Sequence, residues 1–356
     1  MVDSAAAAFW ARREHESDRR SAFEPAVIDE AHLTNLKLSE KSFGQNVVAS
    51  IFLMPNYSLP PVTRIVLEGV ENIPRDGMAM FALNHTDRYN YWPFQYEMWR
   101  HGGLPYTTTW VKGRYYDNAA LSWFFDQCNN IPLPSRGYLI LKDALGVLDR
   151  KLGGDEYRLL RDLLDGRVEQ NDLDDSIPAG VARLLTTPRR DFQPSAETYA
   201  SFIQRWNDHL MSLVERRTHE ALFEKHNNLI VFPQGTRSLR LLPGKPGLAQ
   251  FALRYEVPVV SVGSMGSEEA YPSGNPWAGG GTCRYRIGAP LTLDDALADC
   301  RIDKPYVPFT REAEEHAETF ERAMRCITEA IDDLLDEPYK LDPEGADARS
   351  HADRLI

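Results

Sequence analysis

Two short stretches of this sequence combine residue types that suit proton transfer and anion binding. The first follows an apolar run at 78–83 and reads Asn-His-Thr-Asp over 84–87, with Asn90 close behind. Histidine suits general base catalysis because its pKa lies near neutral pH. His85 is equally explained as a surface or capping residue, and Asp87 and Asn90 suit the first turn of a following helix. This stretch therefore offers a candidate base that needs support from elsewhere in the chain.

The second stretch offers a candidate anion site. It reads Phe-Pro-Gln-Gly-Thr-Arg-Ser over 232–238 and continues the apolar run 228–232. Gly235 lets backbone N–H groups approach a ligand, Thr236 adds a hydroxyl donor, and Arg237 supplies a planar fork that matches phosphate. Taken alone, such a turn is more often plain turn chemistry, so it too gains meaning only in combination.

Both stretches follow apolar runs that have the length of buried strands. Further strands are expected, from apolar, β-branched or alternating composition, at 64–70, 107–111, 131–134, 257–262 and 283–287. Helices are expected from Pro93 onward and at 119–125, 247–255 and 311–335. This mixture predicts an α/β protein. The carboxyl ends of strands and the amino ends of helices open onto one crevice in such folds, so His85 and Arg237 should face a common cleft.

The chain divides into three parts by its composition and by the spacing of its apolar residues. Residues 1–60 read as charged and helical, then apolar, and either pack against the main domain or form a lid or interfacial anchor. Residues 61–300 form the α/β domain, in which 138–227 reads as a helical insertion with a possible partner-binding role. Residues 301–356 form a terminal helix and a polar tail, expected to be loose from Glu337.

An aromatic-rich segment at 89–99 has two interpretations. Tyr89, Tyr91, Trp92, Phe94, Tyr96 and Trp99 all lie within it. Side chains of this kind most often belong to a core helix. Some of them are also suited to line a groove for an apolar substrate chain.

Composition limits the possible partners. The formal charge is 40 minus 52, or −12, which disfavours wholesale attraction to nucleic acid or to an anionic membrane. An anionic substrate must therefore meet a local basic site. The four cysteines are widely spaced, which favours reduced thiols in a cytoplasmic protein and gives no metal-binding pattern. The apolar stretches at 5–10 and 47–54 are too short for a signal peptide or a span of about 20 residues, so a membrane would be met peripherally.

Together the two stretches resemble the lysophospholipid and glycerol-phosphate acyltransferases, typified by bacterial 1-acylglycerol-3-phosphate acyltransferase. The first family motif is N-H-x-x-x-x-D, and this chain has Asn84-His85 with Asn90 at the last position. The third is F-P-E-G-T-R-S, which 232–238 matches at six of seven positions, with Gln234 in place of Glu. Weaker similarity to other family segments lies at 67–74, 131–136 and 257–260. The resemblance implies a mixed sheet flanked by helices.

The resemblance also implies a reaction. In the family, the histidine takes a proton from a glycerol hydroxyl, which attacks an acyl thioester on coenzyme A or acyl carrier protein without a metal or other cofactor. Carried over, His85 is the base and Arg237 binds the phosphate of glycerol 3-phosphate or lysophosphatidic acid. The rest of the third motif, Gln234, Gly235 and Thr236, frames that anion. Arg136 and Lys245 are weaker candidates for the same role. The implied location is cytoplasmic, at the inner face of the membrane.

Both family acids are amides here, and this opens alternatives. Asn90 can accept a hydrogen bond from the imidazole and orient it, but it cannot stabilise the imidazolium by charge. A carboxylate about 4 Å away at an effective dielectric near 20 contributes ~4 kcal/mol, roughly a thousandfold in rate. Asp87 is either the substitute acid or a plain cap or turn residue. From the motif alone, Asn90→Asp is expected to maintain or raise the rate, and Gln234 is the less damaging change.

Two rival functions remain open at this point. One is a weak or inactive relative that binds lipid or a protein partner, for which the two amides are the evidence. The other is an acyltransferase for an acceptor without phosphate, in which Arg237 would be structural.

Overall fold

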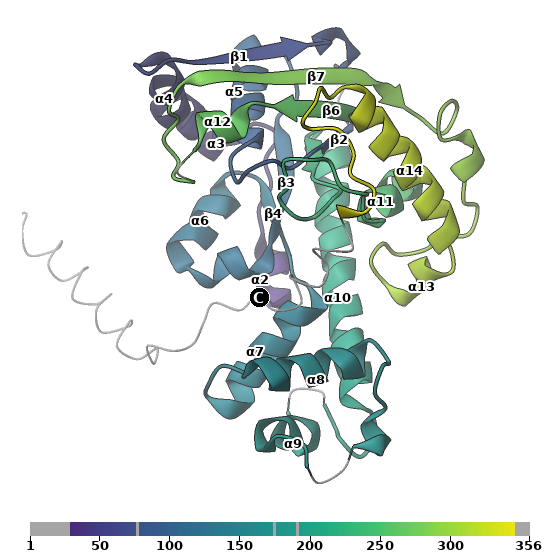
Figure 1. Ribbon diagram of the computed structural model, residues 1–356. Coiled ribbons are helices and arrows are strands. Elements are labelled where there is room, and N and C mark those ends of the chain that lie inside the picture. The colour runs from purple at the N-terminus through teal and green to yellow at the C-terminus, as the bar shows by residue number, and fades with distance from the viewer. Residues whose placement is uncertain (1–28, 76–77, 174–175, 190–191, 273, 346–356) are drawn as a thin grey trace, which may run out of the picture.

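A seven-stranded mixed sheet organises the computed structural model, which describes residues 29–75, 78–173, 176–189, 192–272 and 274–345 (Figure 1). The strand order is β1-β7-β6-β2-β5-β3-β4. The strands are β1 (Thr63–Glu68), β2 (Met80–Leu83), β3 (Thr107–Lys112), β4 (Asn130–Leu133), β5 (Asn228–Val231), β6 (Val259–Met265) and β7 (Gly281–Leu291). β2 to β6 run parallel to one another, and β1 and β7 run antiparallel to them. The α/β class and the mixed sheet flanked by helices are thereby confirmed.

The helices lie on both faces of the sheet and in a separate group beyond it. They are α2 (Glu30–Asn35), α3 (Phe43–Val47), α4 (Met54–Ser58), α5 (Tyr91–His101), α6 (Ala119–Gln127), α7 (Arg136–Leu148), α8 (Gly154–Leu164), α9 (Ala179–Thr186), α10 (Tyr199–His219), α11 (Gly247–Tyr255), α12 (Ser267–Ala270), α13 (Arg311–Glu314) and α14 (Ala317–Asp333). The 3-10 turns are η2 (Val70–Asn72), η3 (Gly113–Asp117), η4 (Gln170–Asp172) and η6 (Ala298–Cys300), and the π-helical turns are η1 (Val48–Leu53) and η5 (Glu220–Glu224).

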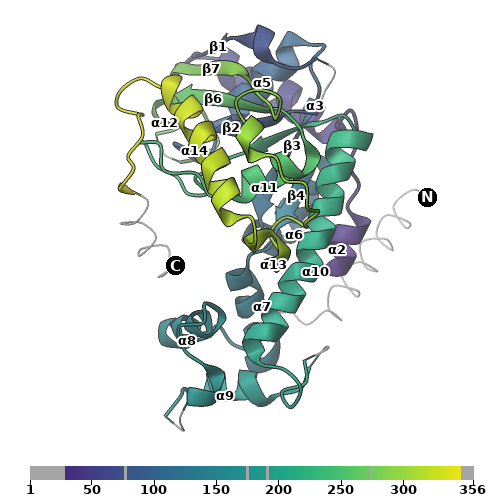
Figure 2. The same ribbon diagram turned by 90° about the vertical axis from the view of Figure 1, so that its right-hand side faces the viewer.

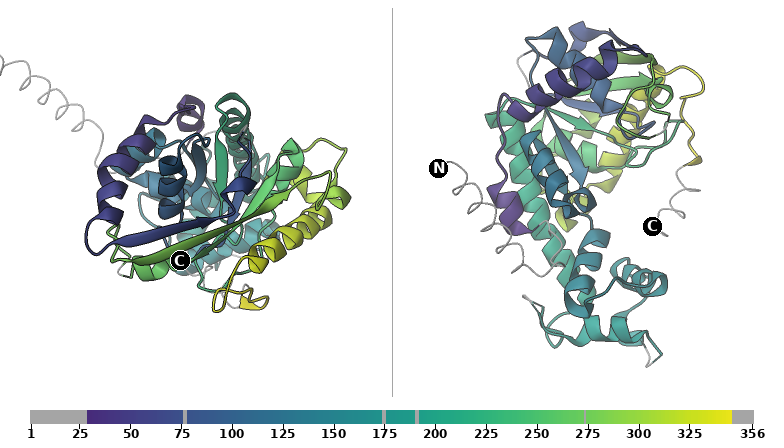
Figure 3. Two further views of the ribbon diagram at one scale, coloured as in Figure 1. Left: turned by 90° about the horizontal axis from the view of Figure 1, so that it is seen from above. Right: turned by 90° about the vertical axis from the view of Figure 1, so that its left-hand side faces the viewer.

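The alternation of side chains along β2 explains why both faces of the sheet are covered. Met80 and Ala82 enter one core with α11 and α14, while Phe81 and Leu83 enter another with η1 and α5. All four side chains are fully buried, as expected for a central parallel strand. Figure 3 shows the purple amino-terminal helices on one side of the sheet and yellow-green α14 on the other.

The segment between β4 and β5 is helical in its described residues and projects away from the sheet (Figures 1 and 2). α7 leads out, α10 leads back, and α10 packs against α2 and β4. Its own core includes Leu160, Val181 and Phe202. A buried ion pair, Arg189 Nη2 to Asp143 Oδ2 at 2.5 Å, ties the distal loop to α7.

Residues 29–60 pack against the α/β body, which was the first of the two expectations for this part. The hydroxyl oxygens of Tyr57 and Tyr271 are 2.7 Å apart, and Asn56 donates to Pro276 O at 3.0 Å. Residues 1–28 of the expected amino-terminal part lie outside the described residues.

Three local expectations are wrong. The helix after His85 begins at Tyr91 rather than Pro93, and the helix expected at 311–335 is divided into α13 and α14. The tail is not loose between 337 and 345. The Tyr339 ring packs into the apolar core beside α14. Its hydroxyl accepts from Gly266 N at 3.0 Å and donates to Glu268, and these contacts hold this part of the tail in place. The expected tail beyond 345 lies outside the described residues.

Candidate functional site

Two neighbouring parallel strands place the two motifs side by side. β2 pairs with β5, and their carboxyl ends carry His85 and Gln234 respectively. Ser238 N donates to His85 O at 2.8 Å, and Gln234 Nε2 makes a longer contact with the same oxygen at 3.4 Å. The two segments, which the whole helical insertion separates in sequence, are therefore hydrogen-bonded to each other at the carboxyl ends of two central strands.

The His85 imidazole lies between an aromatic ring and an amide. It stacks on Phe232 with ring centroids 4.1 Å apart and an interplanar angle of 21°, and its Nδ1 lies 3.2 Å from Asn90 Oδ1. The pKa of His85 is lowered to about 4, chiefly by burial and also by the charges of Arg237 and Lys112, while the hydrogen bond with Asn90 acts to raise it. The ring is therefore neutral at neutral pH, which is the state that a general base requires.

Asn90 is held on two sides before it reaches His85. It occupies the position just before α5 and is fully buried. Its Nδ2 donates to Asn84 O at 2.7 Å, and its backbone oxygen accepts from the Tyr285 hydroxyl at 2.6 Å. The resemblance predicted that this amide orients the histidine, and the structure places the two groups in contact.

The Asp87 carboxylate is engaged away from the imidazole. It accepts from Tyr89 N at 2.7 Å, from the Thr86 hydroxyl at 3.1 Å and from the Ser267 hydroxyl. A bond to the backbone two residues ahead is the typical geometry of an aspartate in a turn. The turn interpretation of Asp87 thus has structural support, and its role as a substitute acid stays a prediction.

The Gly-Thr-Arg turn adopts a backbone that favours glycine. Gly235 has φ +69°, and the side chain of Lys245 lies 3.3 Å from where a Cβ at this position would be. Gln234 is buried, and its Nε2 donates to Thr236 O at 2.9 Å. Gln234 therefore shapes the turn, while Lys245 and Arg237 are exposed beside it.

Three further cations, which the sequence analysis missed, lie around this turn. Burial raises the pKa of the Tyr115 phenol, but the hydrogen bond from Arg114 and the charges of Arg114, Arg88 and Arg237 outweigh burial and lower it overall. The Arg114 guanidinium carbon lies 5.4 Å from the Tyr115 ring centroid. A local basic cluster is thus formed by Arg88, Arg114, Arg237 and Lys112, and the charge of Lys112 also lowers the pKa of His85. The available signal was Lys-Gly-Arg directly at the end of a predicted strand.

Arg136 is placed elsewhere than beside His85. Its guanidinium donates to Gln204 Oε1 at 3.3 Å and lies 3.8 Å from Asp165 Oδ1, both within the helical insertion. These partners explain Arg136 as a tie between α7 and its neighbours, and its role in anion binding stays a prediction.

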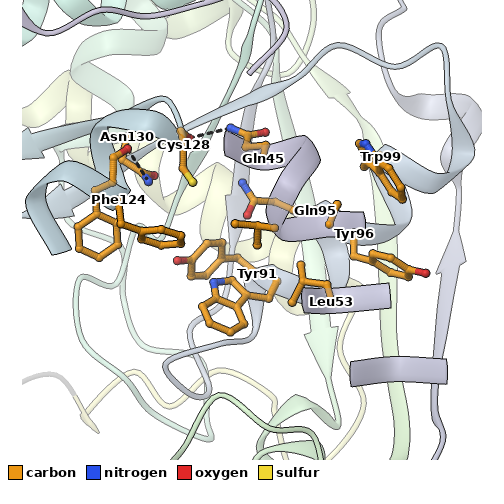
Figure 4. Close-up of a pocket in the computed structure, with 13 residues that line it drawn as sticks. Gln45, Leu53, Tyr91, Gln95, Tyr96, Trp99, Phe124, Cys128 and Asn130 are labelled. Atoms are coloured by element: carbon orange, nitrogen blue, oxygen red, sulfur yellow. Dashed lines mark hydrogen bonds between the residues drawn. The ribbon is translucent and has the colours of Figure 1, made fainter. Parts of the chain in front are cut away.

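A small apolar cavity lies between η1, α5 and α6, beside Tyr91 (Figure 4). Its volume is about 50 Å³. Tyr91 lines it and also contacts Phe232, with centroids 5.9 Å apart, so one ring separates the cavity from the ring stacked on His85. Within the aromatic segment, Phe94 belongs to the core, and Tyr91, Trp92 and Trp99 line the cavity. That this cavity receives a substrate chain stays a prediction. At this volume the cavity holds part of an alkyl chain at most.

Large apolar side chains are exposed on the elements that surround the cavity. Phe43 is 77% exposed, Ile51 71%, Trp123 66% and Trp277 61%. Phe43, Ile51 and Trp123 lie on α3, η1 and α6, which line the cavity. Trp277 lies in the loop after α12, and its ring contacts Phe52 of η1, with centroids 5.1 Å apart. Exposed apolar groups in such proximity mark an interaction surface more often than isolated ones do. Among the described helices, none is long and apolar enough to cross a bilayer.

The sheet and the residues at the carboxyl ends of its strands define an α/β protein with a half-buried histidine beside a basic turn. No family model matches the chain, and no curated protein matches it. Among solved structures it is similar to the 1-acyl-sn-glycerophosphate (LPA) acyltransferase PlsC from Thermotoga maritima. The identity is 18%, the match covers 75% of this chain and 72% of that one, and the TM-score is 0.34. Similarity this low does not transfer a function, so the residues of this chain must support one.

Proposed function

We propose that this protein is an O-acyltransferase of phospholipid biosynthesis. It moves a fatty acyl group from a thioester on coenzyme A or acyl carrier protein to a hydroxyl of glycerol 3-phosphate or lysophosphatidic acid. The observation that carries the proposal is the neutral His85, held by Asn90 and lying within the field of Arg237. A base and an anion site of this kind are the two parts that the reaction needs.

The proposed step needs no covalent enzyme intermediate. His85 accepts the proton of the acceptor hydroxyl through Nε2 as that oxygen attacks the thioester carbonyl. Collapse of the tetrahedral intermediate breaks the C–S bond, and the imidazolium returns the proton to the departing thiolate. The low pKa of His85, about 4, means that the imidazolium is costly and short-lived. Positioning of the two substrates must therefore supply much of the rate enhancement.

The basic cluster is the proposed seat of the acceptor phosphate. Arg237 and Lys245 flank the glycine turn, and Lys112 and Arg114 approach from the end of β3. A chain with net charge −12 that gathers cations at the ends of neighbouring strands is suited to attract an anion to that place. The presence of this cluster favours a phosphate acceptor over a neutral one.

The apolar cavity and the exposed apolar side chains support a lipid environment for the reaction. We place the acyl chain in the cavity between η1, α5 and α6, which must widen to take it, because its volume is about 50 Å³. We place the surface bearing Phe43, Ile51, Trp123 and Trp277 against the inner face of the membrane. Aromatic and aliphatic side chains are those that enter the interfacial layer of a bilayer.

The direct test supplies purified protein with labelled acyl-CoA or acyl carrier protein and with each acceptor in turn. We expect acylated product with a phosphate-bearing acceptor, and loss of at least about a thousandfold in turnover in His85→Ala. His101→Ala is the matched control, because His101 is exposed at the end of α5. Unchanged turnover in His85→Ala would end the proposal.

A second candidate function rests on the amides at 90 and 234. Without a carboxylate beside the base, the chain would be a catalytically weak relative that holds lipid or a protein partner. Stoichiometric binding of acyl-CoA with no turnover on any acceptor would favour it.

A further inference from the structure

We infer that Asn90 is an amide bridge that fixes the tautomer of His85, and that Asn84 is the positioning residue that holds the bridge. The inference rests on the proposed function, in which His85 is the base. It goes beyond the proposed function because it gives the amide a positive role of its own. The donor and the acceptor of the amide are both used here, and the charge of the family's acid would add nothing in their place.

The two hydrogen bonds of Asn90 leave one orientation for its side chain. Nδ2 donates to Asn84 O at 2.7 Å, and Oδ1 lies 3.2 Å from His85 Nδ1. Turning the amide over would set two acceptor oxygens against each other in a fully buried place. Because Oδ1 accepts only, His85 Nδ1 must carry its proton. The lone pair then lies on Nε2, the atom that acts as the base.

The backbone oxygen that accepts from Asn90 belongs to Asn84, and the Asn84 side chain is itself anchored. Asn84 is fully buried, and its side chain makes two bonds to the backbone of Ser264 in β6, with Nδ2 to O at 2.8 Å and Ser264 N to Oδ1 at 2.7 Å. The Tyr285 hydroxyl holds the backbone oxygen of Asn90 from β7. The imidazole is thus oriented by a relay of neutral amides that ends on two strands of the sheet.

An aspartate at position 90 cannot take part in this relay while it is ionised. One of its oxygens would face Asn84 O at the present distance of 2.7 Å, without a hydrogen to share. Burial and this repulsion both favour the protonated acid, which copies the amide and adds no charge. Ionised or protonated, the acid gives no gain in rate. Of the motif-based expectation that Asn90→Asp maintains or raises the rate, the increase is therefore no longer expected.

Nitrogen-15 NMR of histidine-labelled protein tests the tautomer without any need for turnover. The His85 signal, among nine histidines, is assigned by its absence in His85→Gln. We expect the tautomer protonated on Nδ1 in the native chain, and a mixture of both tautomers in Asn90→Ala and Asn84→Ala. A native His85 protonated on Nε2 at neutral pH would overturn the inference.

Kinetics supply the second reading. We expect Asn90→Asp, which keeps the shape of the side chain, to give no gain in kcat, and Asn90→Ala, which removes both hydrogen bonds of the bridge, to lower kcat by about tenfold or more with little change in KM. Asn90→Asp turning over faster than the native chain, or Asn90→Ala turning over as fast, would overturn the inference. Asn228→Ala is the matched control. Asn228 is also fully buried, and its Oδ1 accepts from the backbone N of Ala79 at 3.0 Å, at the end of the strands opposite to His85. It should leave the His85 tautomer unchanged.

The two proposals fail separately. A native chain with no turnover on any acceptor, but with an Nδ1-protonated His85 that Asn90→Ala disturbs, would end acyl transfer and leave the amide relay standing. Full turnover with the opposite tautomer would do the reverse.

Discussion

His85 and Phe232 stack face to face at 4.1 Å, although they lie 147 positions apart in the sequence, 232 minus 85. The ring keeps water from one face of the imidazole. Because burial is the largest cause of the low pKa of His85, about 4, this contact contributes to keeping the proposed base neutral.

Replacing Phe232 by leucine should therefore raise the pKa of His85 from about 4 towards its usual value of 6.5. A histidine proton titration followed by NMR measures this directly. Phe192→Leu removes a fully buried ring within the insertion and should leave the titration where it is. A pKa that stays near 4 in Phe232→Leu would mean that other neighbours carry the desolvation.

The same pKa predicts how stability changes with pH. Between about 4 and 6.5 the unfolded chain binds a proton at position 85 that the folded chain does not, so unfolding becomes easier as pH falls through this range. Between pH ~7 and pH ~5 the native chain should lose about 2 kcal/mol of unfolding free energy through this group alone. Denaturant unfolding of native and His85→Gln proteins at both pH values isolates the contribution. Parallel losses in both proteins would contradict it.

The basic cluster predicts a defect in binding rather than in chemistry. Arg237→Ala should raise KM for the phosphate acceptor by about 10- to 100-fold, the range for a lost hydrogen bond to a charged group. Arg114→Ala should act in the same direction. Arg240→Ala is the control, because Arg240 is exposed three residues further on and donates instead to Leu341 O at 3.2 Å. An unchanged KM in Arg237→Ala would assign Arg237 a structural role.

The exposed apolar surface predicts binding to vesicles. Trp123→Ser and Ile51→Ser should each weaken co-sedimentation with phosphatidylcholine–phosphatidylglycerol vesicles by about tenfold or more, since each removes about 1.5–3 kcal/mol of apolar burial. Leu141→Ser is the matched control, with an apolar side chain 46% exposed on the helical insertion. Equal losses in all three variants, or vesicle binding that none of them reduces, would place the membrane contact elsewhere.

Much of the sheet was predictable from sequence because its strands are short apolar runs that end in turn residues. The neighbourhood of His85 and the Gly-Thr-Arg turn followed from two junctions of that kind. The direction of β7 was not predictable, because alternation along 283–287 is the same in either direction. Lys112 and Arg114 were missed because a lysine and an arginine at the end of a strand have no distinctive spacing.

The role of Asn90 could not be predicted from sequence for a different reason. When the sequence is compared with the family motif, Asn90 is recorded only as the absence of the expected acid. The second bond of its amide, to the backbone oxygen of Asn84, involves a group that every residue has and that no motif records. The same holds for Tyr339, whose seat against Gly266 and Glu268 depends on a fold that the polar tail itself does not reveal.

The strand order has a consequence for how the protein is made. β2 pairs only with β5 and β6 among the described strands, and β1 pairs only with β7, so the first two strands to be synthesised must wait for partners that follow residue 227. A ribosome that has finished the insertion has still not supplied any neighbour for the strand that carries His85. Until then that apolar strand has no partner and is prone to aggregate. A chain truncated before β5 should therefore be insoluble, even if its insertion folds.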